Sequence, residues 1–437
     1  MKKISYLRGL LLTVLVIISI ILSYSIWKGQ PNYESIDVKE VEKTAIDKQK
    51  TAAQVFKPIL GQINQDGEHY QTNAANFVNR IAAQGRNFTF SEVVSSGKKT
   101  SSEYDRLIHQ NGTVELIYPN NIPFSIFSQI YELTGKELEN ASFNRIVFDT
   151  NTTEAGLYTV YFTNDREDTI YQSSLPQKDV AVIKNLVAAS KDDGDMVLLD
   201  AVGTSKHSLF LSKTPPDIKS KKYIIDTMDI SLFTKALFPD VSSVKNEENS
   251  YTDGSSKIVL DTDNKVLEYI NPAQENANPE TQTEVKRASM IQDSFNFINE
   301  HAGWTDEYYF TGYDSTTGSA NFGMFVDNLQ VISGNGMSQI SVTEGQEAVY
   351  KYSRPFFKLD YSIPRESDEV KLPSSATVYE SLKNNSNIDI TAVQMITLGY
   401  KMSWVEDKGL KRIVELEPTW IFKYRGKWFD AGVKESE

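Results

Sequence analysis

The chain has 437 residues, of which 40% are hydrophobic and 24% are charged, a composition typical of folded globular domains. Its formal net charge of −13 repels phosphate backbones and argues against nucleic-acid binding. The sequence contains no cysteine, which excludes disulfides, thiolate nucleophiles, cysteine zinc sites and a lipidated N-terminal cysteine.

The N-terminal segment has the pattern of a membrane anchor. Basic residues occur within 1–8, and the run 9–27 that follows carries no charge. A helix of this length, at about 1.5 Å per residue, extends roughly 28 Å and matches a bilayer's hydrocarbon core. Trp27 and Lys28 would mark the outer membrane interface. We therefore predict a cytoplasmic tip (1–8), a single transmembrane helix (9–27) in the cell membrane and an extracellular remainder.

Cleavage of this segment is the alternative. Ser23-Tyr24-Ser25 fits the small-x-small pattern of a signal-peptide cleavage site, and a cut there would release a secreted protein. The apolar character continues through Ile26 and Trp27, however, and the apolar region of a signal peptide is usually shorter, about 7–15 residues. The pattern favours a retained anchor.

The predicted helix has one face of small and hydroxylated residues. At about 100° per residue, Gly9, Thr13, Ser19 and Ser23 fall within roughly 120° of one another. Such a face lets a second helix approach closely, so these residues are candidate contacts with a partner helix. Single-pass anchors also carry a few serines and threonines without any partner, and the pattern leaves both readings open.

Beyond the anchor, residues 28–48 have the composition of a polar spacer, and a first extracellular α+β domain is expected over 49–201. The apolar patterns predict its strands at 113–119, 145–150 and 157–164, and its helices within 122–135 and 177–194.

The rest of the chain repeats one order of elements, a helix followed by strands. The three predicted helices, each with its strands, are 229–244 with 250–270, 287–304 with 306–332, and 374–385 with 392–407 and 411–430. This order favours a second domain over 202–280 and a third over 281–437. The fold class predicted for the whole extracellular region is therefore three α+β domains with antiparallel sheets, the later two of similar helix-plus-meander topology.

No motif in the sequence argues for catalysis. The histidines, His69, His109, His207 and His301, have no metal-ligand spacing. Ser95–Lys99 contains Ser-x-x-Lys but is interpreted as a solvated loop, because Gly97 interrupts it. Two acidic side chains acting on a glycosidic bond would leave no local signal, so an extracellular hydrolase remains the weakest alternative. We predict a non-enzyme with no catalytic, cofactor or metal residues.

One Asp-containing segment and one Gly-containing segment partly resemble ligand-binding loops. Residues 261–269 begin like a calcium loop but lack its glycine and closing glutamate, and they are interpreted as a hairpin. Residues 333–339 lack the third glycine of a dinucleotide loop and are interpreted as a turn.

Sequence features at the two ends of the chain resemble the YycH family of low-GC Gram-positive bacteria. The family shows a Trp and then Gln-Pro-Asn-Tyr after its helix, as Trp27 and 30–33 do here. It also ends in a Gly-Tyr strand, a Leu-x-Pro-x-Trp strand and a Gly-Lys-Trp turn. Here these are Gly399 and Tyr400, residues 416–420 and residues 426–428.

The resemblance implies a function that no local motif supplies. YycH proteins are non-enzymatic regulators of an essential two-component system for cell-wall metabolism, whose sensor is the WalK (YycG) histidine kinase. They act with a YycI companion, and their transmembrane helices pack against those of the kinase. The expected partners are therefore the kinase, a YycI-like protein and the lipid bilayer, with no cofactor. Whether the kinase is inhibited or activated stays open. The alternative is an anchored extracellular module that binds cell-wall material or a ligand.

Overall fold

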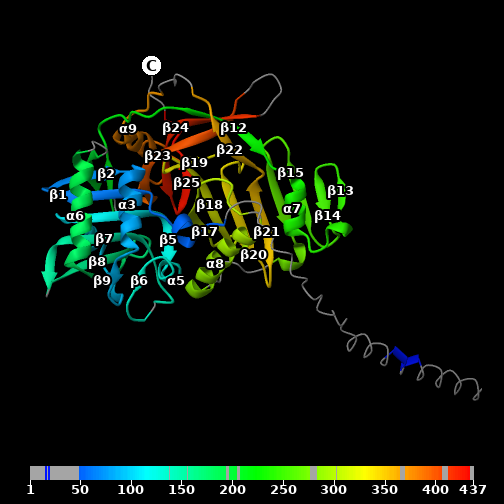
Figure 1. Ribbon diagram of the computed structural model, residues 1–437, viewed down its shortest axis with the longest axis horizontal. Coiled ribbons are helices and arrows are strands. Elements are labelled where there is room, and N and C mark those ends of the chain that lie inside the picture. Colours follow the sequence, from blue (N-terminus) through cyan, green and yellow to red (C-terminus); the bar gives the residue numbers. More distant parts are fainter. Residues whose placement is uncertain are drawn as a thin grey trace, which may run out of the picture. The chain divides into compact units, whose positions relative to one another are not determined.

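The folded part of this computed structural model is built on two large sheets (Figure 1). The structure describes residues 49–433 except 137, 155, 193–195, 204–206, 276–282, 302, 365–369 and 406–411, together with Leu15, Val16, Ile18 and Ser19. The chain divides into two units, Met1–Val41 and Glu42–Glu437, and both sheets belong to the second.

The first sheet has nine strands in the order β11-β10-β2-β1-β5-β7-β8-β9-β4, and every neighbouring pair is antiparallel. Its strands are β1 (Leu60–Gln65), β2 (Glu68–Thr72), β4 (Val94–Lys98), β5 (Thr113–Pro123), β7 (Ser142–Glu154), β8 (Leu157–Asn164), β9 (Thr169–Pro176), β10 (Val197–Gly203) and β11 (Ser208–Leu211). A separate short pair, β3 (Thr89–Phe90) and β6 (Glu132–Leu133), is parallel.

Helices cover both faces of this sheet. The helices of this half are α2 (Ala52–Val55), α3 (Ala75–Gly85), α4 (Ser101–Ile108), α5 (Phe124–Phe127) and α6 (Gln177–Asp192). Successive strand residues face opposite sides, so Ile146 packs in the main core with α3 and α6, whereas Val147 packs beneath α4 with Tyr104 and Ile108. Figure 1 shows α3 and α6 side by side on one face.

The second sheet has fourteen strands along the path β13-β14-β15-β16-β21-β20-β18-β19-β23-β24-β12-β22, with β17 added on β18 and β25 on β24. Its pairs are antiparallel except β19 with β23. Its strands are β12 (Lys221–Thr227), β13 (Lys245–Glu247), β14 (Ser250–Thr252), β15 (Lys257–Asp261), β16 (Val266–Ile270), β17 (Tyr308–Asp314), β18 (Ser319–Val326), β19 (Leu329–Ile332), β20 (Gln339–Glu344), β21 (Val349–Pro355), β22 (Phe357–Ser362), β23 (Val393–Trp404), β24 (Ile413–Tyr424) and β25 (Lys427–Asp430).

Three helices precede groups of strands in this half, in the order expected from the sequence: α7 (Ile230–Leu237), α8 (Glu284–Glu300) and α9 (Ser375–Lys383). Short 3-10 turns, η1 (Val241–Ser243), η2 (Pro272–Gln274) and η4 (Ile390–Ala392), connect the remaining elements. Because β16 pairs with β21, one sheet takes strands from both of the later predicted domains. The domain limits 202–280 and 281–437 stay a prediction.

A small apolar cluster joins the two sheets. Ile59, Leu60 and Ile117 of the first half are buried against Tyr309 and Phe325 of the second, and the two aromatic rings stack with centroids 4.3 Å apart. Burying apolar side chains of this size stabilises each by about 1.5–3 kcal/mol. The contact therefore fixes how the two halves pack within this unit.

The predicted α+β class with antiparallel sheets is confirmed, as are the helix at 177–194 and the strands at 113–119, 145–150 and 157–164. The helix predicted within 122–135 is mostly wrong, since only Phe124–Phe127 is helical. The interpretation of Ser95–Lys99 as a loop is wrong. Val94–Lys98 is an exposed strand at the sheet edge, with an irregular register between Ser95 and Gly97. Residues 261–269 form the expected hairpin between β15 and β16.

Candidate functional site

Most residues of the predicted partner-helix face lie outside the described part of the chain. Gly9, Thr13 and Ser23 are not described, and neither are Trp27 and Lys28. Ser19 is described, and it lies exposed in helical backbone. Among the described residues, no helix combines the length and the apolar character needed to cross a bilayer. The helix 9–27 and its contact face stay a prediction.

A buried group of charged side chains lies on the α4 face of the first sheet. Glu115 of β5 is fully buried, and Arg145 of β7 pairs with it. Arg145 Nη2 also lies 3.1 Å from Asp165 Oδ2, and His109 Nδ1 lies 2.8 Å from Glu115 Oε1. Burial alone would raise the pKa of Glu115, but His109 and Arg145 outweigh it and hold the pKa below its ordinary value.

A second histidine, His207, lies at one end of this group. His207 contacts two carboxylates, Asp105 Oδ1 at 3.2 Å and Asp168 Oδ1 at 3.0 Å. Burial would lower its pKa, but the hydrogen bond to Asp105 and the nearby charge of Asp165 raise it above the ordinary value. No set of histidine and carboxylate side chains within the described residues has the arrangement of a metal site. Through these ion pairs and the contact of His207 Nε2 with Asp165 O, the group connects α4, β5 and β7.

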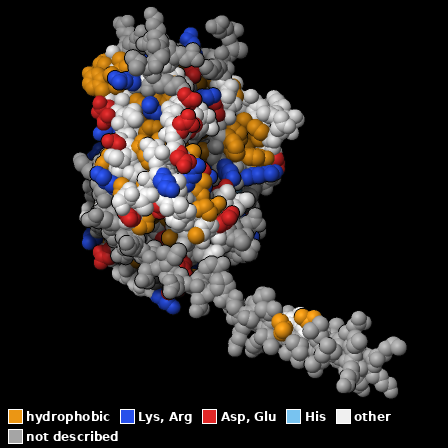
Figure 2. Space-filling model, turned by 90° about the vertical axis from the view of Figure 1, so that its right-hand side faces the viewer, with side chains coloured by type: hydrophobic (Ala, Val, Ile, Leu, Met, Phe, Trp, Pro, Cys, Tyr) orange, Lys and Arg blue, Asp and Glu red, His pale blue; other side chains and the backbone are white. Residues whose placement is uncertain are grey.

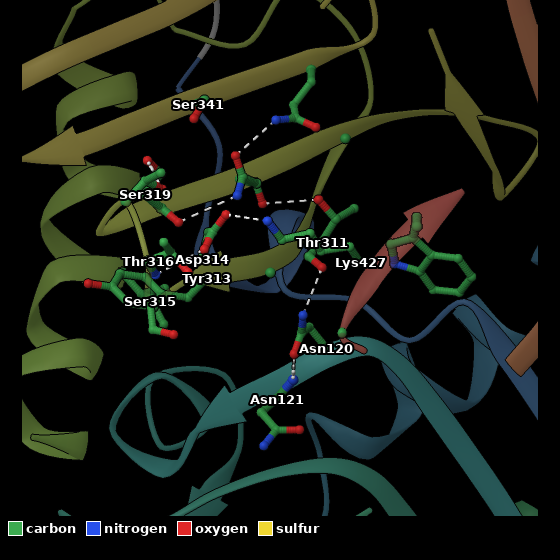
Figure 3. Close-up of a pocket in the computed structure, with 18 of the residues that line it drawn as sticks. Asn120, Asn121, Thr311, Tyr313, Asp314, Ser315, Thr316, Ser319, Ser341 and Lys427 are labelled. Carbon is green, nitrogen blue, oxygen red and sulfur yellow. Dashed lines mark hydrogen bonds and ion pairs between the residues drawn. The ribbon is translucent and has the colours of Figure 1, made fainter. Parts of the chain in front are cut away.

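A large polar cavity lies between the first sheet and the second (Figure 3). Its volume is about 1200 Å³, and one wall comes from Asn120 and Asn121 at the end of β5. The opposite wall comes from α8, β17, β18 and β20, and the β24–β25 hairpin contributes the third side. Asn120 Nδ2 donates a hydrogen bond of 3.1 Å to Thr311 O of β17, which holds two walls together.

The lining of this cavity is rich in hydrogen-bonding groups. Eleven of its residues are Ser or Thr and seven are Asn or Gln, including Ser319, Ser341 and Asn321. The aromatic side chains in the lining include Tyr313 and Trp428. A cavity with this surface suits a ligand that offers many donors and acceptors, because burying polar groups without partners is unfavourable.

Some polar groups in the lining have unused hydrogen-bonding capacity. Gln330 is only 7% exposed, and its Oε1 has no hydrogen-bond partner among the described residues. The indole Nε1 of Trp428 is also buried without a hydrogen-bond partner among the described residues. Lys423 is 6% exposed, and within the described residues its ammonium group donates to a single acceptor, Pro119 O, at 2.7 Å. Native proteins leave few such groups unpaired.

Within the described part of the chain, some charged side chains around the cavity form ion pairs, and others do not. Lys427 lies 2.7 Å from Asp314, and Arg287 pairs with Glu284. No carboxylate among the described residues forms an ion pair with Lys423, whose pKa is lowered to about 8 by burial. On the opposite side, burial raises the pKa of Glu344 to about 7.

The outer surface offers a weaker indication of a site. On the face turned to the viewer in Figure 2, basic, acidic and hydrophobic side chains are interspersed. The cavity is therefore the candidate ligand site. Sequence reasoning missed it because its walls are far apart in the chain, and a polar residue such as Gln330 has no local signature of a lining position.

Comparison with known proteins gives matches along most of the chain. The family model "YycH protein, N-terminal domain" matches residues 5–191, and "YycH protein, C-terminal domain" matches residues 206–435. A relative from Bacillus subtilis (strain 168), the "Two-component system WalR/WalK regulatory protein YycH", is 24% identical over 96% of this chain and 95% of its own. The crystal structure of YycH from Bacillus subtilis superposes with a TM-score of 0.73 at 19% identity, covering 89% of this chain and 99% of that one.

Proposed function

This chain belongs to the YycH protein family, and from that premise we propose that it is a membrane-anchored, non-enzymatic regulator of a WalK-type sensor histidine kinase. The observation that carries the proposal is the relationship to a WalR/WalK regulatory protein over 96% of this chain. A match over so much of both chains supports a shared regulatory role.

In the proposed mechanism the helix 9–27 contacts the kinase within the membrane. Gly9, Thr13, Ser19 and Ser23 form the contact face, and the helix binds one arrangement of the kinase's transmembrane bundle better than the other. Only this difference in affinity shifts the kinase between states, and about 1.4 kcal/mol changes the ratio of the two states tenfold. Trp27 and Lys28 fix the depth of the helix at the outer interface.

In this proposal the ectodomain also takes part, through association with a companion protein. A YycI-like companion of the same layout associates with the chain, and the two anchors act together on the kinase. The relative's role as a WalR/WalK regulatory protein supports the kinase as the target, and the arrangement is compatible with either inhibition or activation of the kinase.

A membrane two-hybrid assay with residues 1–30 alone tests the proposal, with the sensor kinase and the companion as partners. A signal from this fragment places the contact in the anchor. If the full chain gives a signal and the fragment gives none, the contact surface is extracellular and the proposed face is wrong. If neither gives a signal, direct contact with the kinase is refuted.

A second candidate function is an anchored extracellular module that binds cell-wall material or a ligand. The polar cavity of about 1200 Å³ with its buried unpaired groups favours it. The two functions are compatible, because a ligand held by the ectodomain adds a further bias to the same kinase equilibrium.

A further inference from the structure

The polar cavity selects its ligand first by hydrogen bonding. Eighteen Ser, Thr, Asn and Gln residues line it (eleven plus seven), and hydroxyl and amide groups can each donate and accept. An apolar ligand would strip water from these groups without replacing its hydrogen bonds, at about 1–3 kcal/mol for each group left unsatisfied. A ligand covered with hydroxyl groups replaces them.

The size of the cavity points to an oligomer. Sites for small molecules usually occupy about 300–1,000 Å³, and this cavity measures about 1200 Å³. Its walls also carry the flat rings of Tyr313 and Trp428, which offer apolar surfaces against which a saturated ring can pack. A chain of several hydroxylated rings fits both features.

The charges indicate an anionic group on that ligand. Although the whole chain has a net charge of −13, the lining carries six basic and five acidic residues. Two of the basic residues, Lys423 and Arg425, have no ion pair among the described residues, whereas Lys427, Arg287 and Lys351 each have one. The lining carboxylates of Glu275 and Glu344 also form no ion pair with a described residue, but they lie directly after η2 and on β20, and not on the β24–β25 hairpin.

Lys423 and Arg425 lie close together at the β24 end of the cavity. Lys423 is in β24 and is buried, whereas Arg425 is exposed in the turn before β25. The nearby carboxylate of Asp165 is already compensated by Arg145, 3.1 Å away. An anion bound here would lie near the two cations and near the Asp165 carboxylate, whose charge is largely neutralised by Arg145.

We propose that this cavity binds an acidic oligosaccharide, a chain of hydroxylated rings that carries carboxylate or phosphate groups, with Lys423 and Arg425 holding one anionic group. Gln330 accepts a hydrogen bond from a sugar hydroxyl through its unpaired amide oxygen. This inference deepens the second candidate function and rests on it, and it requires no contact with the kinase.

Calorimetric titration of the full-length protein in detergent micelles tests the assignment. The probes are tetragalacturonate for a carboxylate source, poly(glycerol phosphate) for a phosphate source, and maltotetraose as the neutral control. At least one acidic probe should bind, about tenfold or more tighter than maltotetraose, because hydrogen bonds between ionised groups are the strong ones. The acidic probe that binds identifies the source.

Arg425→Gln should weaken binding of that acidic probe about tenfold and leave the affinity for maltotetraose unchanged. Lys245→Gln removes a positive charge from β13, outside the cavity lining, and is the matched control. Lys423→Met is the second variant, and it is scored only after a single cooperative thermal transition above the titration temperature has shown that it is folded.

Three results would overturn the assignment. One is the absence of binding of both acidic probes at millimolar concentration, and another is equal affinity for maltotetraose. The third is an equal loss of affinity in Arg425→Gln and Lys245→Gln, which would indicate a diffuse charge effect. Sedimentation with purified wall polymer distinguishes binding of polymer by the ectodomain from binding through this cavity. If the wild type and Arg425→Gln sediment with the polymer equally, the ectodomain binds polymer but not through this cavity. The two-hybrid signal of residues 1–30 is independent of all these results.

Discussion

Lys423 Nζ donates a hydrogen bond of 2.7 Å to the carbonyl oxygen of Pro119, although the two residues lie 304 positions apart in the chain. The bond joins β24 of the second sheet to β5 of the first. It places an ammonium group with one described acceptor at the edge of the polar cavity. This single contact therefore connects the packing of the two halves with the charge of the candidate site.

Lys423 should make stability rise with pH in the alkaline range. Its pKa is lowered from 10.5 to about 8 in the folded protein, so between these values the unfolded chain binds a proton that the folded protein does not. Stability then increases with pH, by about 2 kcal/mol between pH 7 and 9.5. Urea unfolding should show this rise in the wild type and not in Lys423→Met. Parallel curves for the two proteins would contradict the prediction.

Two histidines should give opposite pH effects. The pKa of His207 is raised, so its stabilisation is complete below about pH 6.5 and is lost as the pH rises through its folded value. Burial lowers the pKa of His69, so its contribution grows as the pH rises towards 6.5.

Denaturation of His207→Gln and His69→Gln between pH 5 and 8 measures both contributions. The difference between wild type and His207→Gln should shrink with rising pH, and that between wild type and His69→Gln should change in the other direction. Slopes of the same sign would refute one of the two assignments.

Glu115→Gln should destabilise the protein by about 3 kcal/mol, because it leaves the charge of Arg145 partly uncompensated in a buried position. Glu115 is fully buried between Arg145 and His109. The control is Glu268→Gln, which removes a carboxylate from the partly exposed pair with Lys351 and should change little. The two denaturation midpoints are compared. A loss in Glu115→Gln no larger than in the control would show that the buried network contributes little.

Gly399→Ala should destabilise the second sheet by about 1–3 kcal/mol through overpacking. A Cβ at Gly399 would lie 2.8 Å from Gln330 O and 3.0 Å from Ile421, at the pairing of β19 with β23. Gly334→Ala is the control, since its Cβ would meet nothing within 4 Å. Thermal unfolding compares the two variants, and equal melting temperatures would contradict the steric argument.

Replacing Ser19 and Ser23 by Leu should change the output of the sensor kinase at unchanged protein level, because bulky side chains keep a partner helix away. Val14→Leu with Ile18→Leu, on the opposite side of the predicted helix, is the matched control. A WalR-dependent reporter and immunoblotting of the membrane fraction measure output and abundance. Unchanged output at normal abundance would remove this face as the contact.

Sequence patterns predicted the regular elements better than they predicted the site. The periodicity of 177–194 and of 392–430 reports side chains that alternate between core and solvent, and α6, β23, β24 and β25 follow it. At 122–135 the apolar residues Phe124, Ile126 and Phe127 are all buried, but a short apolar run does not distinguish a helix from other buried segments.

The cavity and the ion network are formed by residues that only tertiary structure brings together. Asn120 meets Thr311 across 191 positions, and His207 meets Asp105 across 102. No local sequence motif around the histidines indicates that they take part in a buried ion network. The Gly-Tyr motif carries part of the family resemblance, and in the structure Gly399 permits the close approach of β19.

The position of β12 has a consequence for how the chain folds. This strand lies directly after the first sheet in sequence, yet it pairs with β22 and with β24, near the C-terminus. During synthesis, residues 221–227 therefore have no strand partner until β22 (Phe357–Ser362) has been made, and their other edge stays unpaired until β24 (Ile413–Tyr424) has been made. Non-local pairing of this kind is slow and leaves strand edges open to aggregation. The second sheet can consequently close only after β24 has been made, and a chain truncated before β24 would expose an unpaired edge of β12.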